Sequence, residues 1–223
     1  MPRRIIPAVF ALCSLQAGAA VTRVNGHIHV EVDGRPFTDF YYGPDAPKPY
    51  LHPLRSASGQ IVTRSFPMEN IPGESITDQH HRGVWLAYRD VNGYDFRQNE
   101  FSYQNKNAGK VTTRRIYDLQ SGQDRGSFRG TFAWLSPAGD AILEESRTMT
   151  FSGDARMRIV DVDLTLKALV DTTFGDPKDG AFSVRLAEPL TEKNSARWSI
   201  RKAAAKWSRT GASWQAGWIT AAN

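Results

Sequence analysis

The chain has 223 residues, of which 40% are hydrophobic and 23% charged, so it is long and apolar enough for a sizeable core. Its net charge of +5 is uneven, because two arginines lie within residues 1–19 and six basic residues follow residue 192 without an acid. Residues 20–192 therefore hold 20 basic and 23 acidic side chains. This balance offers no basic face for nucleic acid, and we expect no nucleic-acid partner.

The N-terminus has the pattern of a secretory signal peptide. Two arginines precede an apolar run at residues 5–11, and the small residues at 17–19 suit a signal peptidase. The apolar run is shorter than the ~20 residues of a spanning helix, so no membrane span is expected. We predict a signal peptide at residues 1–19, cleavage after Ala19 or Ala20, and a secreted or periplasmic protein. Cys13, the only cysteine, would leave with the signal, so the mature chain would have no disulfide.

Apolar and polar residues then alternate with a period of two, which indicates β-strands. Residues 28–32 and 37–42 lie on either side of an Asp-Gly turn at 33–36 and predict a hairpin. The proline-rich segment 43–49 is predicted to be a loop, because proline has no N–H to give to a sheet. After it we expect two short strands and a second irregular loop, at residues 50–55, 61–66 and 67–77.

Longer strands separated by turns follow. In the clearest one, residues 159–167, valines and leucines alternate with aspartates and other polar residues, which predicts one buried and one solvated face. Strands at short, regular spacing with turns between them predict an all-β fold, an antiparallel β-sandwich. The expected strands are residues 84–91, 109–119, 128–134, 141–151, 159–167 and 182–186.

Residues 193–223 differ from the rest of the chain. They hold four of the six tryptophans and show neither strand alternation nor a helical stripe, although residues 201–207 are compatible with a short helix. We interpret this basic, tryptophan-rich tail as an atypical C-terminus produced by truncation or a frameshift. The sandwich domain is then expected at residues 20–192, and it would be incomplete.

The most concentrated chemistry lies before the strand at residue 84, where His80, His81 and Arg82 follow Asp78. Three interpretations of the histidine pair stay open: a metal site with Asp78, a ligand or proton-transfer role, or structural hydrogen bonds at a strand start. Glu74 is a second nearby carboxylate. Arg82 suits bidentate binding of a ligand carboxylate, or pairing with a neighbouring acid.

Lys48, Tyr50 and His52 form a polar and aromatic cluster beside the proline-rich loop. Aromatic faces stack on sugar rings, while lysine and histidine bind hydroxyl and acid groups, so the cluster is a candidate pocket wall. The alternative is a loop that its tyrosines hold in place.

Two further pairs share a strand face because they are two residues apart: His27 with His29, and Asp161 with Asp163. We interpret both as solvated faces. The sequence has no phosphate-binding glycine loop, dinucleotide fingerprint, nucleophile elbow or Cys/His zinc framework.

The order of these motifs resembles the secreted bacterial family catalogued as "methane oxygenase PmoA"-like. The resemblance implies a largely β, sandwich-type domain without a settled activity, found in bacteria that degrade polysaccharides. The family pattern places Asp-His-Pro before the histidine pair, where this chain has Thr77-Asp78-Gln79, so a third local histidine is missing. Family domains also continue with more strands and another histidine motif. The resemblance covers about residues 38–190 through Tyr41-Tyr42-Gly43-Pro44, Lys48-Pro49-Tyr50-Leu51-His52-Pro53-Leu54, Pro72-Gly73-Glu74, His80-His81-Arg82-Gly83-Val84-Trp85, Asn92-Gly93-Tyr94-Asp95-Phe96 and Phe174-Gly175-Asp176-Pro177-Lys178-Asp179-Gly180.

We therefore expect a secreted β-sandwich protein that binds or processes a carbohydrate or a sugar acid in a pocket lined by histidine and arginine. His80 and His81 are the candidate catalytic residues, as proton-transfer groups. The alternatives are a non-catalytic carbohydrate-binding module and a metal-dependent oxygenase with His80, His81 and Asp78 as ligands. The sequence leaves enzyme activity, cofactor and oligomeric state open, and the expected partner is a glycan or small molecule. The candidate ligand-binding residues are Lys48, Tyr50, His52, Glu74, Asp78 and Arg82.

Overall fold

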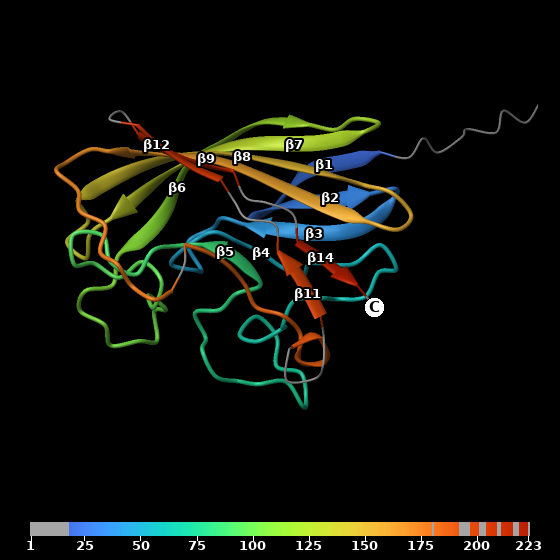
Figure 1. Ribbon diagram of the computed structural model, residues 1–223, viewed down its shortest axis with the longest axis horizontal. Helices are drawn as coiled ribbons and strands as arrows, with labels where there is room; N and C mark the ends of the chain where they lie inside the picture. Colours follow the sequence, from blue (N-terminus) through green and yellow to red (C-terminus); the bar gives the residue numbers. More distant parts are fainter. Residues whose placement is uncertain are drawn as a thin grey trace, which may run out of the picture.

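The computed structural model describes residues 18–179, 181–191, 197–200, 204–208, 211–215 and 219–222. Two six-stranded antiparallel sheets face each other, so the predicted all-β sandwich is confirmed (Figure 1). The first sheet has the order β1-β2-β3-β4-β5-β10. Its strands are β1 (Ala19–Val24), β2 (His27–Val32), β3 (Arg35–Tyr41), β4 (Tyr50–Leu51), β5 (Val84–Leu86) and β10 (Phe182–Val184).

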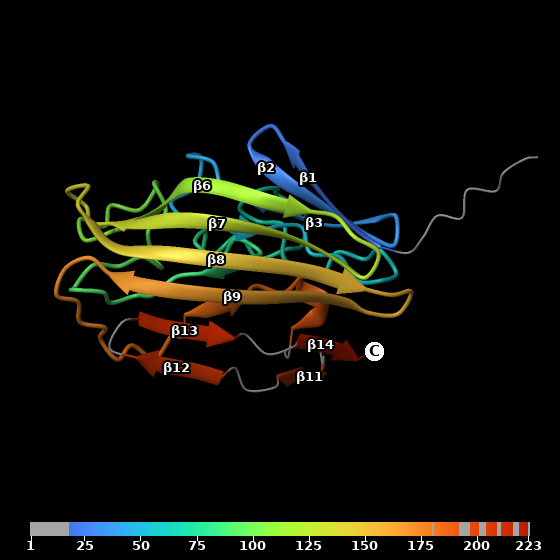
Figure 2. The ribbon, with the colours of Figure 1, turned by 90° about the horizontal axis from the view of Figure 1, so that it is seen from above.

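The second sheet has the order β12-β13-β9-β8-β7-β6, and its long strands run side by side in Figure 2. β11 (Arg197–Ile200) and β14 (Ile219–Ala222) pair with each other, and η1 (Glu188–Leu190) is a 3₁₀ turn. In the part of the chain that is described, no helix is long and apolar enough to cross a bilayer. The strands of the second sheet are β6 (Lys110–Gln120), β7 (Arg125–Leu135), β8 (Ala141–Gly153), β9 (Arg158–Ala168), β12 (Ala204–Ser208) and β13 (Gly211–Gln215).

The core lies between the sheets, where strand alternation points one face of each strand inward. On β7, Phe128, Phe132 and Trp134 are buried and share a parity, as predicted. On β9, Val162 and Leu164 are buried while the aspartates at 161 and 163 are exposed, which confirms the amphipathic strand and the solvated Asp161–Asp163 face.

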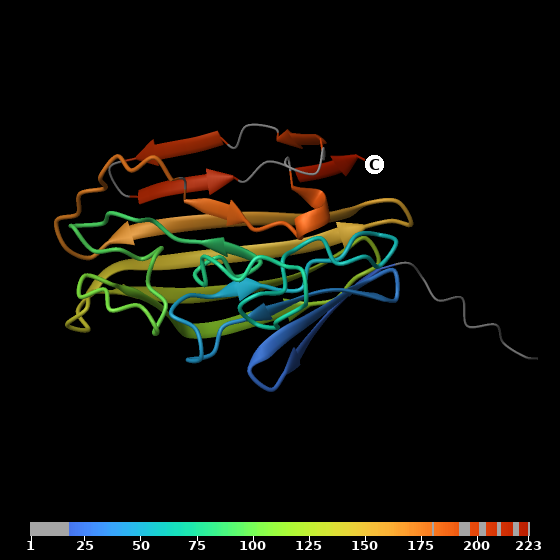
Figure 3. The ribbon, with the colours of Figure 1, turned by 90° about the horizontal axis from the view of Figure 1, so that it is seen from below.

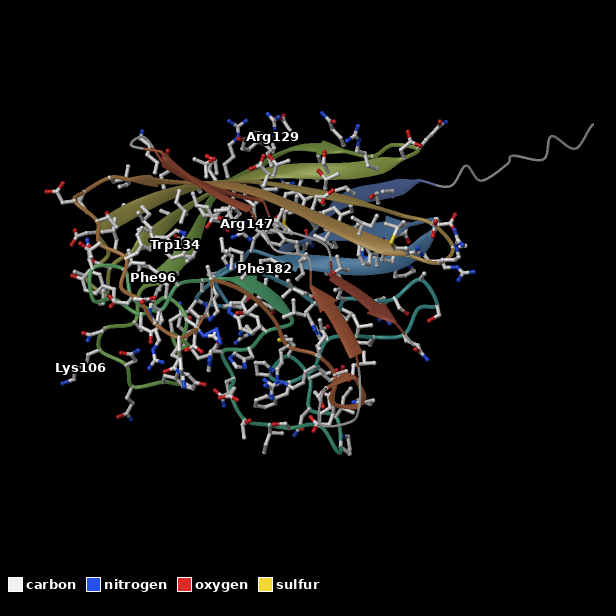
Figure 4. The ribbon with its side chains drawn as sticks, viewed as in Figure 1. Phe96, Lys106, Arg129, Trp134, Arg147 and Phe182 are labelled. Carbon is white, nitrogen blue, oxygen red and sulfur yellow. The ribbon has the colours of Figure 1, made fainter. Side chains whose placement is uncertain are left out.

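The core also contains a buried charged pair. Arg147 donates to Glu145 at 2.6 Å, and Trp134 Nε1 donates to the other oxygen of that carboxylate at 2.9 Å. Figure 4 shows Trp134 and Arg147 between the two sheets, whereas Arg129 projects from the outer surface of the second sheet. An apolar cavity of about 320 Å³ lies between β5 and β9, lined by Leu86, Tyr88, Trp134, Leu164, Leu166, Phe174, Gly175 and Ala181.

Several strand boundaries differ from the sequence prediction. β1 was not expected, β4 has only two residues, and β5 ends at Leu86 rather than at residue 91. Residues 61–66 form no strand but only isolated bridges, Arg55 with Ile61 and Thr63 with Leu186. A short apolar run has the same pattern in a strand as in a loop buried against a sheet, and tertiary packing decides between them.

The tail adds strands to the second sheet. Residues 204–208 form β12 and not the short helix considered from the sequence, because antiparallel pairing with β13 overrides the helix propensity of alanine. β13 in turn pairs with β9, from Ala212 opposite Leu166 to Gln215 opposite Asp163. The second sheet therefore extends beyond the boundary expected at residue 192.

A layer of loops covers the outer face of the first sheet, below β4 and β5 in Figure 1 and toward the viewer in Figure 3. β5 separates the two environments. Val84 and Leu86 belong to the sandwich core, whereas Trp85, between them, packs with Tyr50 and Ala87 in a separate apolar cluster. The predicted site residues near β5 therefore lie between the first sheet and the loops.

Candidate functional site

Aromatic side chains line the outer face of the first sheet. Cross-strand pairing places His27 opposite Tyr41, Tyr41 opposite Tyr50, and Tyr50 opposite Trp85. The rings of Tyr41 and Tyr50 stack at 5.1 Å, and the Arg82 guanidinium lies 5.5 Å from the Tyr50 ring centroid. Tyr50 is 7% exposed, so its ring is used for packing, as in the interpretation that tyrosines hold the loop in place.

Arg82 is fully engaged by a carboxylate from the following loop. Its Nε and Nη2 donate to the two oxygens of Glu100 at 2.9 and 2.7 Å. Burial lowers the pKa of Arg82, but the hydrogen bond and charge of Glu100 outweigh burial and raise it overall. Of the two roles considered for Arg82, the structure shows pairing with a neighbouring acid.

Lys48 is buried in the same network. Its Nζ donates to the Arg97 carbonyl at 2.9 Å and to Asn99 Oδ1 at 2.6 Å, and lies 3.9 Å from Glu100 Oε1. Burial lowers the pKa of Lys48 to about 7, although the charge of Glu100 raises it in part. Lys48 therefore fixes the backbone of the loop that carries Arg97 and Glu100.

The two predicted histidines lie together under the loops. Their ring centroids are 4.0 Å apart, and His80 Nδ1 is 3.1 Å from the Tyr103 hydroxyl. Burial, together with the charges of Lys48 and Arg97, lowers the pKa of His80 to about 4. Burial, His80 and Arg97 together lower the pKa of His81 to about 3. Both imidazoles are therefore neutral near neutral pH.

His81, Trp85 and Arg97 form the most unusual part of the site. The His81 ring stacks on Trp85 at 4.9 Å, and the Arg97 guanidinium lies 5.7 Å from the Trp85 ring centroid. Arg97 Nη2 is 3.2 Å from His81 Nε2. Since a guanidinium only donates, His81 Nε2 is the acceptor and the proton of the neutral ring is on Nδ1.

Three buried N–H groups of this cluster have no hydrogen-bond acceptor among the described residues: His81 Nδ1, Trp85 Nε1 and Arg97 Nε. A buried donor without an acceptor destabilises a fold by about 1–3 kcal/mol, so native structures nearly always satisfy such groups. Three in one cluster mark this as the place where the protein is best prepared for an oxygen-bearing ligand or ordered water.

Asp179, in the loop before β10, is the carboxylate that forms an ion pair with the Arg97 guanidinium. Its Oδ2 lies 3.8 Å from Arg97 Nε and 3.4 Å from Arg89 Nη1. Arg97 also donates to Ser183 Oγ at 3.3 Å. The side chains of Arg89 and Asp179 are 41% and 25% exposed, whereas that of Arg97 is 12% exposed. The Arg89–Asp179 side is therefore the more solvent-exposed side of the cluster.

The remaining predicted residues have other surroundings. His52 Nδ1 lies 3.3 Å from Thr63 Oγ1, and burial lowers the His52 pKa to about 4. Glu74 accepts a hydrogen bond from the Ser65 backbone at 2.8 Å. The side chain of Asp78 is exposed. These three residues brace or border the loops.

Arg64, which the sequence did not single out, shapes the approach to the histidine pair. Its buried guanidinium donates to the carbonyls of Ser75, Thr77 and Asp78 at 3.2, 2.8 and 2.9 Å. One side chain thereby fixes the backbone immediately before His80.

Metal-binding side chains do not gather at the candidate site. Within the described ranges, no group of three or more histidine, cysteine, aspartate or glutamate side chains is placed to hold a metal ion. His27 and His29 do share a face, as predicted, and both lie near Asp39 Oδ1, at 3.7 and 2.6 Å. These two side chains are about a quarter to a third exposed, so they form a partly solvated polar face.

The structure brings five of the eight candidate residues together in this region, and several of their partners were not expected from the sequence. Lys48, Tyr50, His80, His81 and Arg82 do come together. Three of the five missed partners share one signal, a run of consecutive polar residues between Phe96 and Phe101, at residues 97–100. They are Arg97, Asn99 and Glu100, with Tyr103 and Asp179 from further along the chain.

The fold and the site together define a β-sandwich protein with a buried, basic polar cluster beneath the loops of one outer face. The chain belongs to a family of unknown function, DUF6807, whose model matches residues 27–222. No curated protein and no solved structure matches the chain. The match extends over the tail strands as well as the first sheet. The methane oxygenase PmoA-like label comes from the motifs alone, and no comparison adds support for it.

Proposed function

We propose that the protein binds a carbohydrate or a sugar acid at the cluster of His81, Trp85 and Arg97. The observation that carries the proposal is the set of three buried N–H groups without acceptors. Hydroxyl and carboxylate oxygens of a sugar are the acceptors that such donors need, and a polar ligand gains specificity when it pairs donors that are otherwise unpaired.

The electrostatic surroundings support the same proposal. Burial is the main cause that lowers the pKa of His80 and His81. The nearby basic side chains Lys48 and Arg97 lower the pKa of His80 further, and Arg97 also lowers that of His81. In both cases these basic side chains have a larger effect than the opposing charge of Asp78, which favours a net positive potential at the cluster. Charged and polar groups in an enclosed site interact more strongly than in water. Oxygen-rich and anionic ligands are therefore favoured over cations.

Binding is favoured over acid–base catalysis by the histidine pair. General acids and bases work best when their pKa lies near the operating pH. Burial holds the pKa of His80 at about 4 and that of His81 at about 3, so neither imidazole is suited to carry a proton near neutral pH. The structure thus supports the carbohydrate-binding alternative more directly than the proton-transfer role. The metal-dependent oxygenase gains no support from the described residues, which gather no metal-ligand cluster.

The proposal includes an extracellular or periplasmic location, based on the signal-peptide pattern at residues 1–19. Those residues lie outside the described part of the chain, apart from Gly18 and Ala19, which begins β1. N-terminal sequencing of exported protein should find Ala20 or Val21 as the first residue.

Calorimetric titration with D-glucose, D-galactose and the corresponding uronic acids tests the binding proposal. Wild-type protein should bind at least one of the four saturably. His81→Phe keeps the stacking on Trp85 but removes the Nδ1–H donor and the partner of Arg97, so it should weaken binding about tenfold or more.

Arg129→Gln is the matched control, because Arg129 projects from the outer surface of the second sheet, and its affinity should equal that of the wild type (Figure 4). If none of the four sugars binds, or if His81→Phe binds as tightly as the wild type, the proposal is wrong. Ordered water would then be the acceptor for the three buried N–H groups.

A further inference from the structure

Two arginines of the site differ sharply in how well an internal carboxylate satisfies them. Arg82 makes two close, charge-assisted hydrogen bonds to Glu100, at 2.9 and 2.7 Å. Arg97 lies 3.8 Å from Asp179 through its Nε, and that N–H has no hydrogen bond. Charge-assisted bonds are normally ~2.7–2.9 Å long. Arg97, and not Arg82, therefore retains capacity for a second carboxylate.

The charge balance around Arg97 points in the same direction. The ion pairs of the site join four basic side chains to three carboxylates. Two of the three carboxylates already accept close hydrogen bonds. Glu100 accepts from Arg82, and Asp95 Oδ1 accepts from the backbone N–H groups of residues 97 and 98. While Lys48 is protonated, below its pKa of about 7, an added carboxylate brings this network to neutrality. The groups are Lys48, Arg82, Arg89 and Arg97 with Asp95, Glu100 and Asp179.

Asp179 is the carboxylate best able to give way to a ligand. Its contacts with Arg89 and Arg97, at 3.4 and 3.8 Å, are both longer than a close ion pair, and its side chain is 25% exposed. Glu100, by contrast, is buried between Lys48 and Arg82. Asp179, on the solvent side of Arg97, is thus bound less tightly by its arginine partners than Glu100 is.

We infer that the ligand of this site carries a carboxylate that binds Arg97, and that Asp179 competes with it as an internal carboxylate. The inference rests on the proposed function and narrows its ligand from sugars in general to sugar acids. Arg97 Nε and the neighbouring His81 Nδ1–H and Trp85 Nε1–H supply donors for the acid and the adjacent hydroxyl oxygens.

Titrations of wild type and Asp179→Asn with D-glucuronate and with D-glucose test this inference. The two sugars differ in one carboxylate, and the substitution keeps the size of residue 179 while removing its charge. Glucuronate should bind wild type more tightly than glucose does, and Asp179→Asn should bind glucuronate about fivefold more tightly or better while its glucose affinity is unchanged.

A competition experiment on wild-type protein gives a second reading that needs no variant. Acetate should compete with glucuronate for Arg97 and so weaken its apparent binding. Equal wild-type affinities for the two sugars, weaker glucuronate binding by Asp179→Asn, or no effect of acetate would overturn the inference while the proposed function survives. If the protein binds neither glucose nor glucuronate, nor their galactose counterparts, both the inference and the proposed function are wrong.

Discussion

Gly83 links the histidine pair to β5, and its backbone conformation allows no other residue easily. Its φ is +60°, and a Cβ there would lie 2.1 Å from the Leu51 carbonyl oxygen. That distance is far below van der Waals contact, so a side chain would push β5 away from β4. Glycine at this position keeps Trp85 in register with Tyr50.

Gly83→Ala should therefore lower the free energy of unfolding by about 2–4 kcal/mol, through backbone strain and the steric clash with Leu51. Gly93→Ala is the matched control, because Gly93 also has a positive φ, +77°, but a Cβ there would have no atom within 4 Å. Its cost should be about 1 kcal/mol. Urea denaturation of both variants measures the difference, and equal losses would contradict the close approach at Gly83.

Some residues of the site could be recognised from the sequence, and others could not. His80, His81 and Arg82 stand out in the sequence because titratable groups there are adjacent. The sequence does not show which arginine has an N–H group left for a ligand. That depends on two distances: Glu100 lies 2.7 Å from Arg82, whereas Asp179 lies 3.8 Å from Arg97. Those are distances between loops, and no local pattern encodes them.

At the scale of elements, the long strands were predictable and the loops were not. β7, β8 and β9 have buried faces with a period of two over eleven or more residues, and their turns carry glycine, proline or aspartate. The loops over β4 and β5 are instead organised by single buried side chains. Arg64 binds three carbonyl groups of one loop, and Lys48 binds a carbonyl group of a second loop. Periodicity does not reveal such contacts.

The loop layer should make the protein sensitive to acid. In the folded state burial keeps the pKa of His52 and His80 at about 4 and that of His81 at about 3. The unfolded value is ~6.5, so between these limits the unfolded chain binds protons that the folded chain excludes. The free energy of unfolding should thus fall as the pH falls from ~6.5, by up to ~1.4 kcal/mol per pH unit for each histidine.

Denaturant titrations at a series of pH values measure this slope. His81→Phe removes one of the three histidines and keeps the ring stacking on Trp85. The variant should lose less stability than the wild type between ~pH 6 and ~pH 4, by about one histidine's share. Identical slopes would show that His81 does not exclude its proton in the folded protein.

At the scale of the whole molecule, the sandwich followed from the sequence but its extent did not. The tail lacks a clear alternation, so it was interpreted as an atypical addition to a domain at residues 20–192. In the structure β13 pairs with β9 along Asp163–Leu166, and the family match also reaches residue 222. Pairing between distant strands supplies order that the local sequence of the tail does not predict.

A chain that ends at Thr191 should expose the backbone of β9, because it lacks the strand that pairs with it. An uncovered long edge strand is a template for association with other chains. The shortened protein should therefore form higher oligomers or aggregates in size-exclusion chromatography with light scattering. If it instead stays monodisperse and melts at the temperature of the full chain, residues 20–192 are a self-sufficient domain.

The central claim is that Arg97, with His81 and Trp85, binds a sugar acid beneath the loops of the first sheet. A crystal structure of the full chain grown with D-glucuronate tests it most directly. The glucuronate carboxylate should lie within hydrogen-bond distance of Arg97, with Asp179 moved away from the guanidinium and the Arg82–Glu100 pair intact. Glucuronate bound elsewhere on the molecule, or Asp179 still between the ligand and Arg97, would contradict it.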